Sequence, residues 1–354
     1  MSEIDFHAPH AIILSMRAKI FSVIFIFLSS AAFCASKTLA FADYSLTAFY
    51  KESVQPGDAV FVRLVFETKD KRLLKSSAEP GTESGSLEIR GPDDDKSSPG
   101  KAVAKSELYQ LDKSADKKLI KSVLLGGAPI SSWAKTGGYK AVIVYKAFGK
   151  AESVIEIPFK IIGKEFVSET IPLNASNTAI KTDTSAKRAG QIDRLNKILD
   201  TKDYSGIYET GAFLPPTNAT RRTSFFADRR VYAYSDGKSS TSLHYGIDYG
   251  VPSGSEVRSC GGGKVVMAED RVTTGWSVCI EHLPGLYSLY YHMSGLSVEI
   301  GQSVGAGELI GLSGATGLAT GPHLHWEIRL NMEAVSPDFF TEDFTFKKES
   351  GGQK

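Results

Sequence analysis

The distribution of histidine constrains this chain more than any other feature. Of its seven histidines, two come before the first apolar run (His7 and His10), and the other five are His244, His282, His292, His323 and His325. Residues 44–243 contain none. Histidine is the commonest metal ligand and the side chain best suited to proton transfer near neutral pH. Its confinement to residues 243–327 therefore predicts a functional site in that segment.

Two of these histidines are separated by one residue, in the order His323, Leu324, His325. Side chains at positions i and i+2 of a strand point to the same face, so a strand here would direct both imidazoles into one groove. Leu324 and Trp326 would then face the core. The Gly-rich residues 317–322 allow a sharp turn before this strand, and the pair is a candidate ligand site.

A nitrogen and a carboxylate oxygen lie close together at His244 and Asp248. Catalytic zinc typically has three protein ligands of this kind and one position left for water. Two histidines and one aspartate would leave other histidines free to move protons. Each pattern is weak alone, but their order, with Tyr290-Tyr291-His292-Met293-Ser294 between them, is a strong indication of a zinc hydrolase.

Composition excludes few classes of protein. The chain has 354 residues, enough for about two domains, and its 42% hydrophobic and 23% charged residues are ordinary for a globular protein. The formal net charge of +1 gives no indication of nucleic acid or an anionic membrane as the main partner.

The N-terminus is typical of a secretory signal peptide. Arg17 and Lys19 precede the apolar residues 20–28, and Ala40-Phe41-Ala42 offers a small-x-small cleavage site. We therefore expect residues 1–42 to be a signal peptide and the exported chain to act in the periplasm or cell envelope. An uncleaved signal anchor, which would tether the chain to a membrane, is the alternative. Met16 is an alternative start residue.

Two cysteines, Cys260 and Cys279, follow the expected cleavage site. In an oxidising compartment they could form a disulfide. The other interpretation is that they are two separate small apolar residues on strands. The sequence leaves both open.

Residues 43–170 predict an antiparallel β-sandwich-like accessory domain. Apolar residues alternate along strands such as the one containing Val60, Val62, Leu64 and Phe66, and Gly- and Pro-containing turns separate them. Part of residues 76–100, rich in Ser, Gly, Pro and Asp, predicts an exposed loop. This region shows no catalytic constellation and is interpreted as a spacer or targeting module.

Residues 171–204 predict a linker and a helix. The first part, residues 172–184, is polar and without periodicity, whereas residues 185–200 place Ile192, Leu195, Ile198 and Leu199 at helical spacing. Ser185 could cap the start of that helix. Beyond it, residues 205–345 have dense glycine and short strands and predict a second β-rich domain, and residues 346–354 form a polar tail.

This second domain resembles the lysostaphin-type zinc endopeptidases of bacterial cell walls. The resemblance covers about residues 213–340 and depends on three motifs: His244-Tyr245-Gly246-Ile247-Asp248, Tyr290 to Ser294, and Gly321-Pro322-His323-Leu324-His325. One departure is Ala227, which occupies a position where the family usually has glycine, and this puts the local turn geometry in doubt.

The resemblance implies a fold, a site and a reaction. The fold would be a β-rich groove open at both ends, binding one Zn²⁺ per chain. The zinc ligands would be His244, Asp248 and His325, and the catalytic histidines outside the ligand set would be His292 and His323. The family cleaves peptide bonds in the stem peptides or cross-links of peptidoglycan by means of a metal-activated water. His282 matches a structural position and is left out of the site.

Two other functions compete with this one. The first is a non-catalytic protein of the same fold that binds peptidoglycan or activates another wall hydrolase, but such relatives usually lose zinc ligands, and all five expected residues are retained here. The second is a structural or adhesion protein in which the sandwich is the functional part. A regulatory protein partner is also compatible with the sequence.

Overall fold

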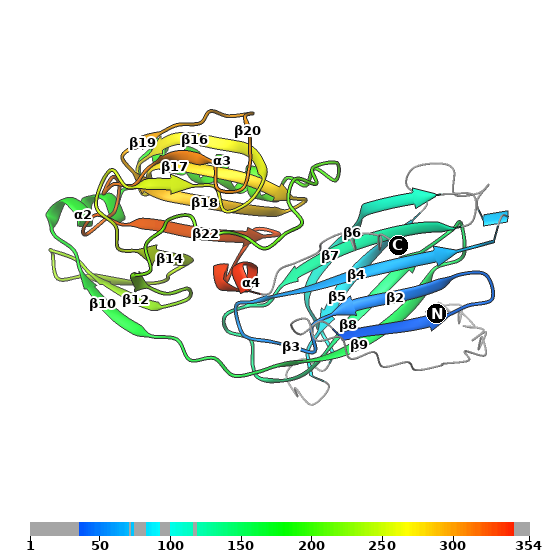
Figure 1. The fold of residues 1–354 in the computed structure, drawn as a ribbon. Coiled ribbons are helices and arrows are strands. Elements are labelled where there is room, and N and C mark those ends of the chain that lie inside the picture. Colours follow the sequence, from blue (N-terminus) through cyan, green and yellow to red (C-terminus); the bar gives the residue numbers. More distant parts are fainter. Residues whose placement is uncertain (1–34, 71, 74–82, 93–99, 116–118, 343–354) are drawn as a thin grey trace, which may run out of the picture.

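The computed structural model describes residues 35–70, 72–73, 83–92, 100–115 and 119–342, which form two β-rich regions lying side by side (Figure 1). The expected signal segment within residues 1–34 and the polar tail lie outside the described residues. Residues 35–40, which we expected to end the signal peptide, form the edge strand β1 and pair with β2. No helix in the described part of the chain is long and apolar enough to cross a membrane.

The N-terminal region is a nine-stranded arrangement with the order β1-β2-β4-β7-β6-β5-β8-β9-β3. Its strands are β1 (Ala35–Ala40), β2 (Ser45–Tyr50), β3 (Ser53–Val54), β4 (Ala59–Thr68), β5 (Ser84–Arg90), β6 (Ala102–Ala115), β7 (Ile120–Pro129), β8 (Gly137–Lys146) and β9 (Ser153–Ile161). All neighbours are antiparallel except β3 and β9. The mainly β fold predicted from the sequence is confirmed.

Strand β6 passes from one half of this arrangement to the other. Its first half pairs with β5 and its second half pairs with β7. The core draws side chains from both halves, including Leu64 and Leu124 from one and Leu87 and Ile143 from the other. The predicted loop within residues 76–100 is partly described, and strand β5 lies inside that stretch.

The expected linker is partly wrong, because it contains regular structure. Residues 168–172 form β10 (Ser168–Pro172) and residues 175–181 form α2 (Ala175–Lys181). The side chain of Asn174 caps α2 by accepting a hydrogen bond from the Asn177 amide. At seven residues, α2 is too short to show helical periodicity. The next helix, α3 (Ala186–Asp200), is confirmed, as is its cap at Ser185.

The C-terminal region contains three sheets. The largest has the order β11-β14-β22-β18-β17-β16-β20 with β23 beside β22, and the smaller ones are β10-β12-β13 and β15-β21-β19. The remaining elements are β11 (Arg222–Ser224), β12 (Arg229–Ala233), β13 (Ser239–Leu243), β14 (Gly246–Tyr249), β15 (Glu256–Arg258), β16 (Gly263–Arg271), β17 (Gly275–Leu283), β18 (Leu286–Met293), β19 (Gly295–Leu296), β20 (Ser303–Val304), β21 (Leu309–Leu312), β22 (Leu324–Leu330), β23 (Glu333–Val335) and α4 (Pro337–Glu342).

Strand β10 ties the segment between the two regions to the C-terminal region, since it pairs in parallel with β12. Helix α3 packs on the β16–β17 hairpin of another sheet, where the amide of Gln191 bonds the backbone of Asp270 and Val272. Both segments therefore help to build the C-terminal region, although the sequence indicated only a connection.

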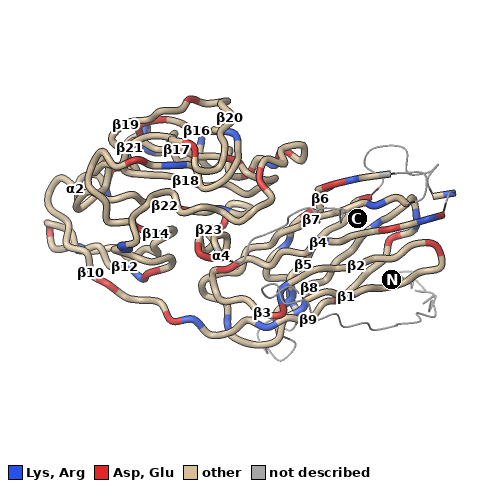
Figure 2. Tube along the Cα trace, viewed as in Figure 1, with Lys and Arg blue, Asp and Glu red and all other residues tan. Residues whose placement is uncertain are grey.

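The two regions contact one another through hydrogen bonds and through apolar packing. Asn331 donates to the Gly127 carbonyl at 2.9 Å, and the Ser336 amide donates to the Gly57 carbonyl at 2.7 Å. Arg229 donates to the Ser132 carbonyl at 2.9 Å and lies over the Trp133 ring. Phe61 packs on Phe339 and Phe340 within one continuous apolar cluster. Charges of both signs are spread along both regions (Figure 2).

Candidate metal centre

Three strands bring the candidate ligands together. Strands β14 and β22 pair so that Asp248 lies opposite His325, and β18 places Tyr291 on the other side of His325. Strand β22 is almost fully buried, with Leu324 and Trp326 in the core as the alternation predicted. Glycine is required at position 246, where β14 approaches β22 closely, because an added Cβ would lie 2.2 Å from the Trp326 carbonyl oxygen.

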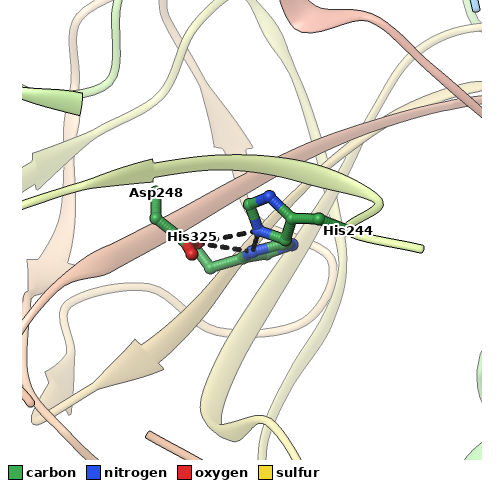
Figure 3. Close-up of side chains that lie close together, drawn as sticks. All are labelled: His244, Asp248 and His325. Atoms are coloured by element: carbon green, nitrogen blue, oxygen red, sulfur yellow. Dashed lines mark hydrogen bonds and ion pairs between the residues drawn. The ribbon is translucent and has the colours of Figure 1, made fainter. Parts of the chain in front are cut away.

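His244, Asp248 and His325 point toward one another (Figure 3). His244 Nε2 lies 3.0 Å from Asp248 Oδ1 and 2.9 Å from His325 Nδ1, and His325 Nδ1 lies 2.9 Å from Asp248 Oδ1. All three side chains are buried, and their potential ligand atoms lie within 4.8 Å of one another. Among the described residues, these three side chains form the group of three or more His, Cys, Asp or Glu residues that could hold a metal ion.

The outer hydrogen bonds of the two imidazoles fit a metal site. His244 Nδ1 lies 2.8 Å from the Phe225 carbonyl, and His325 Nε2 lies 3.4 Å from Glu327 Oε2. Because carbonyl and carboxylate oxygens only accept, these ring nitrogens carry the protons. When both rings are neutral, the other ring nitrogens, His244 Nε2 and His325 Nδ1, direct their lone pairs to the same place as Asp248 Oδ1. Three converging lone pairs repel one another unless a cation lies between them.

Electrostatics in the cluster follow from burial and proximity. Burial lowers the pKa of His244, although Asp248 opposes this. Burial alone would raise the pKa of Asp248, but His244 and His325 hold that pKa well below its usual range. Burial would lower the pKa of His325, yet Asp248 and Glu327 raise it to about 9, so a bound metal ion would have to displace the proton that this ring otherwise shares with Asp248. The carboxylate therefore stays charged, as a metal ligand must.

Two further side chains hold the ligands and were missed by the sequence analysis. Arg230 donates to Asp248 Oδ2 at 2.9 Å and to Glu169 Oε1 at 2.8 Å. Glu327 lies beside His325 and also bonds Arg329. Glu327 could have been found, since it stands two residues after His325 on the same strand face. Arg230 carries no such signal, because its contact with Asp248 depends on the pairing of β12 in a separate sheet.

The two other predicted site residues lie next to the cluster. The ring centroids of His292 and His323 are 4.7 Å apart, and His323 Nε2 is 3.8 Å from Asp248 Oδ1. Each ring donates from Nδ1 to a carbonyl, of Thr316 for His292 and of Gly321 for His323, so each Nε2 has a free lone pair. Burial, together with His323 and His325, lowers the pKa of His292 to about 3. His292 also has a positive φ of 61°, a strained geometry that is concentrated at functional sites.

All five residues surround a pocket of about 550 Å³ lined by both the C-terminal region and the segment that precedes it. His244, Asp248, His292, His323 and His325 are among the lining residues. The preceding segment contributes Glu169, Ile171, Leu173 and Lys181. The sequence analysis placed these four residues at the end of the accessory domain and in a linker, and so missed them.

The departure at Ala227 has a structural explanation. Its φ is +63°, a conformation that glycine adopts easily and other residues rarely do. Its amide nevertheless donates to the His244 carbonyl at 2.7 Å. The turn is therefore kept with alanine, and it fixes the backbone of a candidate ligand at the cost of local strain.

The remaining histidine and the two cysteines lie away from the pocket. His282 is fully buried, bonds the Gly262 carbonyl at 2.7 Å and the Ser288 hydroxyl at 2.7 Å, and does not line the pocket. Cys260 and Cys279 are both free and buried, so the structure matches the interpretation of two separate apolar residues. Burial raises the pKa of the Cys260 thiol to about 12.

Comparisons with known proteins agree with this geometry. Residues 242–337 match the model of Peptidase family M23. The chain is 43% identical over 95 residues to the DD-carboxypeptidase/endopeptidase Mpg of Neisseria meningitidis, covering 27% of this chain and 22% of that protein. It is 30% identical over 168 residues to the peptidoglycan DD-endopeptidase ShyA of Vibrio cholerae, covering 48% of this chain and 38% of that protein.

The chain therefore spans well under two thirds of the length of either relative. Among solved structures, a putative peptidase M23 from Pseudomonas aeruginosa is 20% identical, with a TM-score of 0.48 over 83% of this chain and 96% of that one. The sequence match includes His244, Asp248, His292, His323 and His325, the five residues that the structure gathers around one pocket. Residues 242–337 of this chain are a domain of peptidase family M23.

Proposed function

We propose that this protein is a zinc-dependent endopeptidase that hydrolyses peptide bonds in peptidoglycan. The observation that carries the proposal is the convergence of three buried lone-pair donors beside two further imidazoles in an open pocket. A structural cluster of buried histidines would not require free Nε2 lone pairs facing a pocket.

The ligands in this proposal are His244, Asp248 and His325. Two imidazoles and one carboxylate form the kind of three-ligand set that catalytic zinc sites use. When bound, zinc supplies Lewis acidity and a water of lowered pKa, near 7. Arg230 and Glu327 hold the ligands in place, since each bonds a ligand atom that faces away from the centre of the cluster.

The proton transfers fall to His292 and His323. A base that accepts a proton must be neutral at working pH, and the pKa of His292, lowered to about 3 by burial, keeps it so. The free Nε2 of either ring can take the proton of the attacking water and later give a proton to the leaving amine. The carbonyls of Thr316 and Gly321 hold the tautomers that this exchange requires.

The names of relatives support the choice of substrate. ShyA and a second Vibrio cholerae relative, ShyB, are both named peptidoglycan DD-endopeptidases. A peptidoglycan substrate lies outside the cytoplasm, and the basic-apolar-small pattern of residues 17–42 supports export to the periplasm or cell envelope. We propose the N-terminal region, residues 43–170, as an accessory domain of this enzyme.

Mass spectrometry of the soluble products from purified sacculi tests the proposal. The full chain is incubated with sacculi as purified, after chelation, and after chelation followed by added zinc. We expect new peptide fragments that disappear on chelation and return with zinc, and their masses identify the bond. Fragments that persist in chelator would refute the metal mechanism, and no fragments from zinc-loaded protein would refute the activity.

A further inference from the structure

Two cationic side chains of the pocket, Lys181 and Arg230, come from outside the residues that match the peptidase family, and Arg230 is paired with Asp248 and Glu169. Lys181 is the last residue of α2 and lines the same pocket as the five site residues. Helix α2 is held against the pocket by Asn177, whose side-chain amide donates to the Ala319 carbonyl at 3.0 Å. The position of Lys181 is therefore set by the fold, although it precedes the matched residues 242–337.

Lys181 shares the pocket with the carboxylates of Glu169 and Asp248, and both of these pair with Arg230. The Lys181 ammonium lies 4.1 Å from the centre of the Tyr232 ring, and the charged groups that act on it are the guanidiniums of Arg188 and Arg230. Within the described residues Lys181 makes no ion pair with a carboxylate. Two acidic residues of the same segment are already engaged, Glu169 with Arg230 and Asp183 with the Ser185 amide.

Such an arrangement is unfavourable for the protein alone. Desolvation and the two guanidiniums lower the pKa of Lys181, so the ammonium is less stable here than in water. The face of the Tyr232 ring and the partial negative charge at the C-terminal end of α2 both attract the Lys181 ammonium to this position. Arg230 is paired with Glu169 and Asp248, whereas the Lys181 ammonium has no carboxylate partner among the described residues. An anion bound in the pocket would neutralise it.

We propose that Lys181 binds a free carboxylate of the substrate peptide. The inference rests on the proposed function, because the ligand is the peptide whose scissile bond lies at the metal centre. Lys181 and the candidate ligands line one pocket, so the carboxylate belongs to a residue near that bond. Recognition by this lysine would make the segment before the peptidase domain part of its specificity.

A pair of peptides tests this assignment. Both are cross-linked stem-peptide dimers, one with its free carboxylates and one with them amidated. The full zinc-loaded chain is compared with Lys181→Met and with Lys181→Arg, which keeps the charge. Lys187→Met is the matched control, because Lys187 is an exposed lysine on the adjacent helix α3 and does not line the pocket.

The expected result is a change in KM with kcat nearly constant. Lys181→Met should raise KM for the free-carboxylate peptide by about tenfold, a change that corresponds to about 1.4 kcal/mol. Amidation should cause the same loss with the wild-type chain and no further loss with Lys181→Met. Lys181→Arg should restore most of the binding, and Lys187→Met should match wild type. Independent, additive effects of amidation and Lys181→Met would overturn the proposal.

A binding measurement separates this proposal from the proposed reaction. Calorimetry of the same peptides with the chelated full chain reports affinity without turnover. Weaker binding of the amidated peptide to wild type, but not to Lys181→Met, would support the carboxylate site even if no peptide is cleaved. Equal binding of both peptides to both chains would refute it, whatever the outcome of the sacculus digestion.

Discussion

The two regions of the molecule treat polar side chains in opposite ways. Among the described residues of the N-terminal sheets, the buried polar or charged side chains are Thr68, Glu83, Ser106 and Ser122. In the C-terminal region, four histidines, two arginines and several carboxylates are buried. Ion pairs of the N-terminal region, such as Arg72–Asp70 and Lys140–Glu156, are largely exposed, whereas Arg230–Asp248 is buried.

This contrast indicates which region buries polar groups at a cost in folding free energy for the sake of function. Burying a polar group is unfavourable unless it is hydrogen-bonded, and burying a charge is more so unless it is paired. Exposed ion pairs contribute little to stability. The N-terminal region is thus an ordinary apolar core with a solvated surface, and the C-terminal region holds polar groups in an arrangement that a ligand would complete.

The largest expected effect is on the metal centre. His325→Ala removes one of three converging donors, so we expect zinc content to fall from about one per chain to near zero and turnover to fall at least about 1000-fold. Elemental analysis and product release measure the two quantities. Glu83→Gln, at the one buried carboxylate among the described residues of the N-terminal sheets, which pairs with the partly exposed Lys113, is the control and should lower stability without changing zinc content. Equal zinc loss in both variants would show that the loss follows from general destabilisation and not from the removal of a ligand.

A smaller loss is expected from the proton-transfer residues. His323→Ala leaves His244, Asp248 and His325 in place, so zinc should remain near one per chain. Turnover should fall by about 100- to 10,000-fold, the usual contribution of a general acid or base. Measuring zinc and turnover on one preparation distinguishes this from unfolding. A His323→Ala protein with wild-type turnover would contradict the role proposed for His323.

Low pH should lower the free energy of unfolding through a buried histidine of the C-terminal region, His282. Burial lowers the pKa of His282 from 6.5 to about 4, so the unfolded chain binds a proton here before the folded chain does. Its contribution to stability is therefore present above pH 6.5 and is lost as pH falls toward 4, on the order of 3 kcal/mol. Urea unfolding at pH 7 and pH 4 should show a smaller pH dependence for His282→Gln than for wild type. An equal dependence would place the acid sensitivity elsewhere.

The smallest effect is expected at Ala227. Glycine removes the Cβ strain of its positive φ but gains freedom in the unfolded chain, so Ala227→Gly should stabilise the protein by about 0.5–1 kcal/mol. Denaturant midpoints measure this, and zinc content should not change. Destabilisation would show that the alanine methyl group, which is buried, contributes more by packing than it costs in strain.

The sequence predicted features that depend on neighbours along the chain. Alternation placed Leu324 and Trp326 in the core, helical spacing located α3, and short motifs named the five residues around the pocket. Contacts that depend on the pairing of strands far apart in the chain could not be predicted from the sequence. Glu169 reaches Arg230 only because β10 pairs with β12 across about sixty residues of chain. Helix α2 was missed because one cap and seven residues give too little periodicity.

The hydrogen bonds between the two regions have a mechanical consequence. Two bodies joined at one point can rotate freely, but each further point removes some of that freedom. Asn331–Gly127, Ser336–Gly57 and Arg229–Ser132 involve separate segments of the C-terminal region, so a hinge motion that preserves one of them must stretch or break others. Since Arg229 adjoins Arg230, which bonds Asp248 of the candidate metal centre, one of these contacts lies one residue from the support of that site.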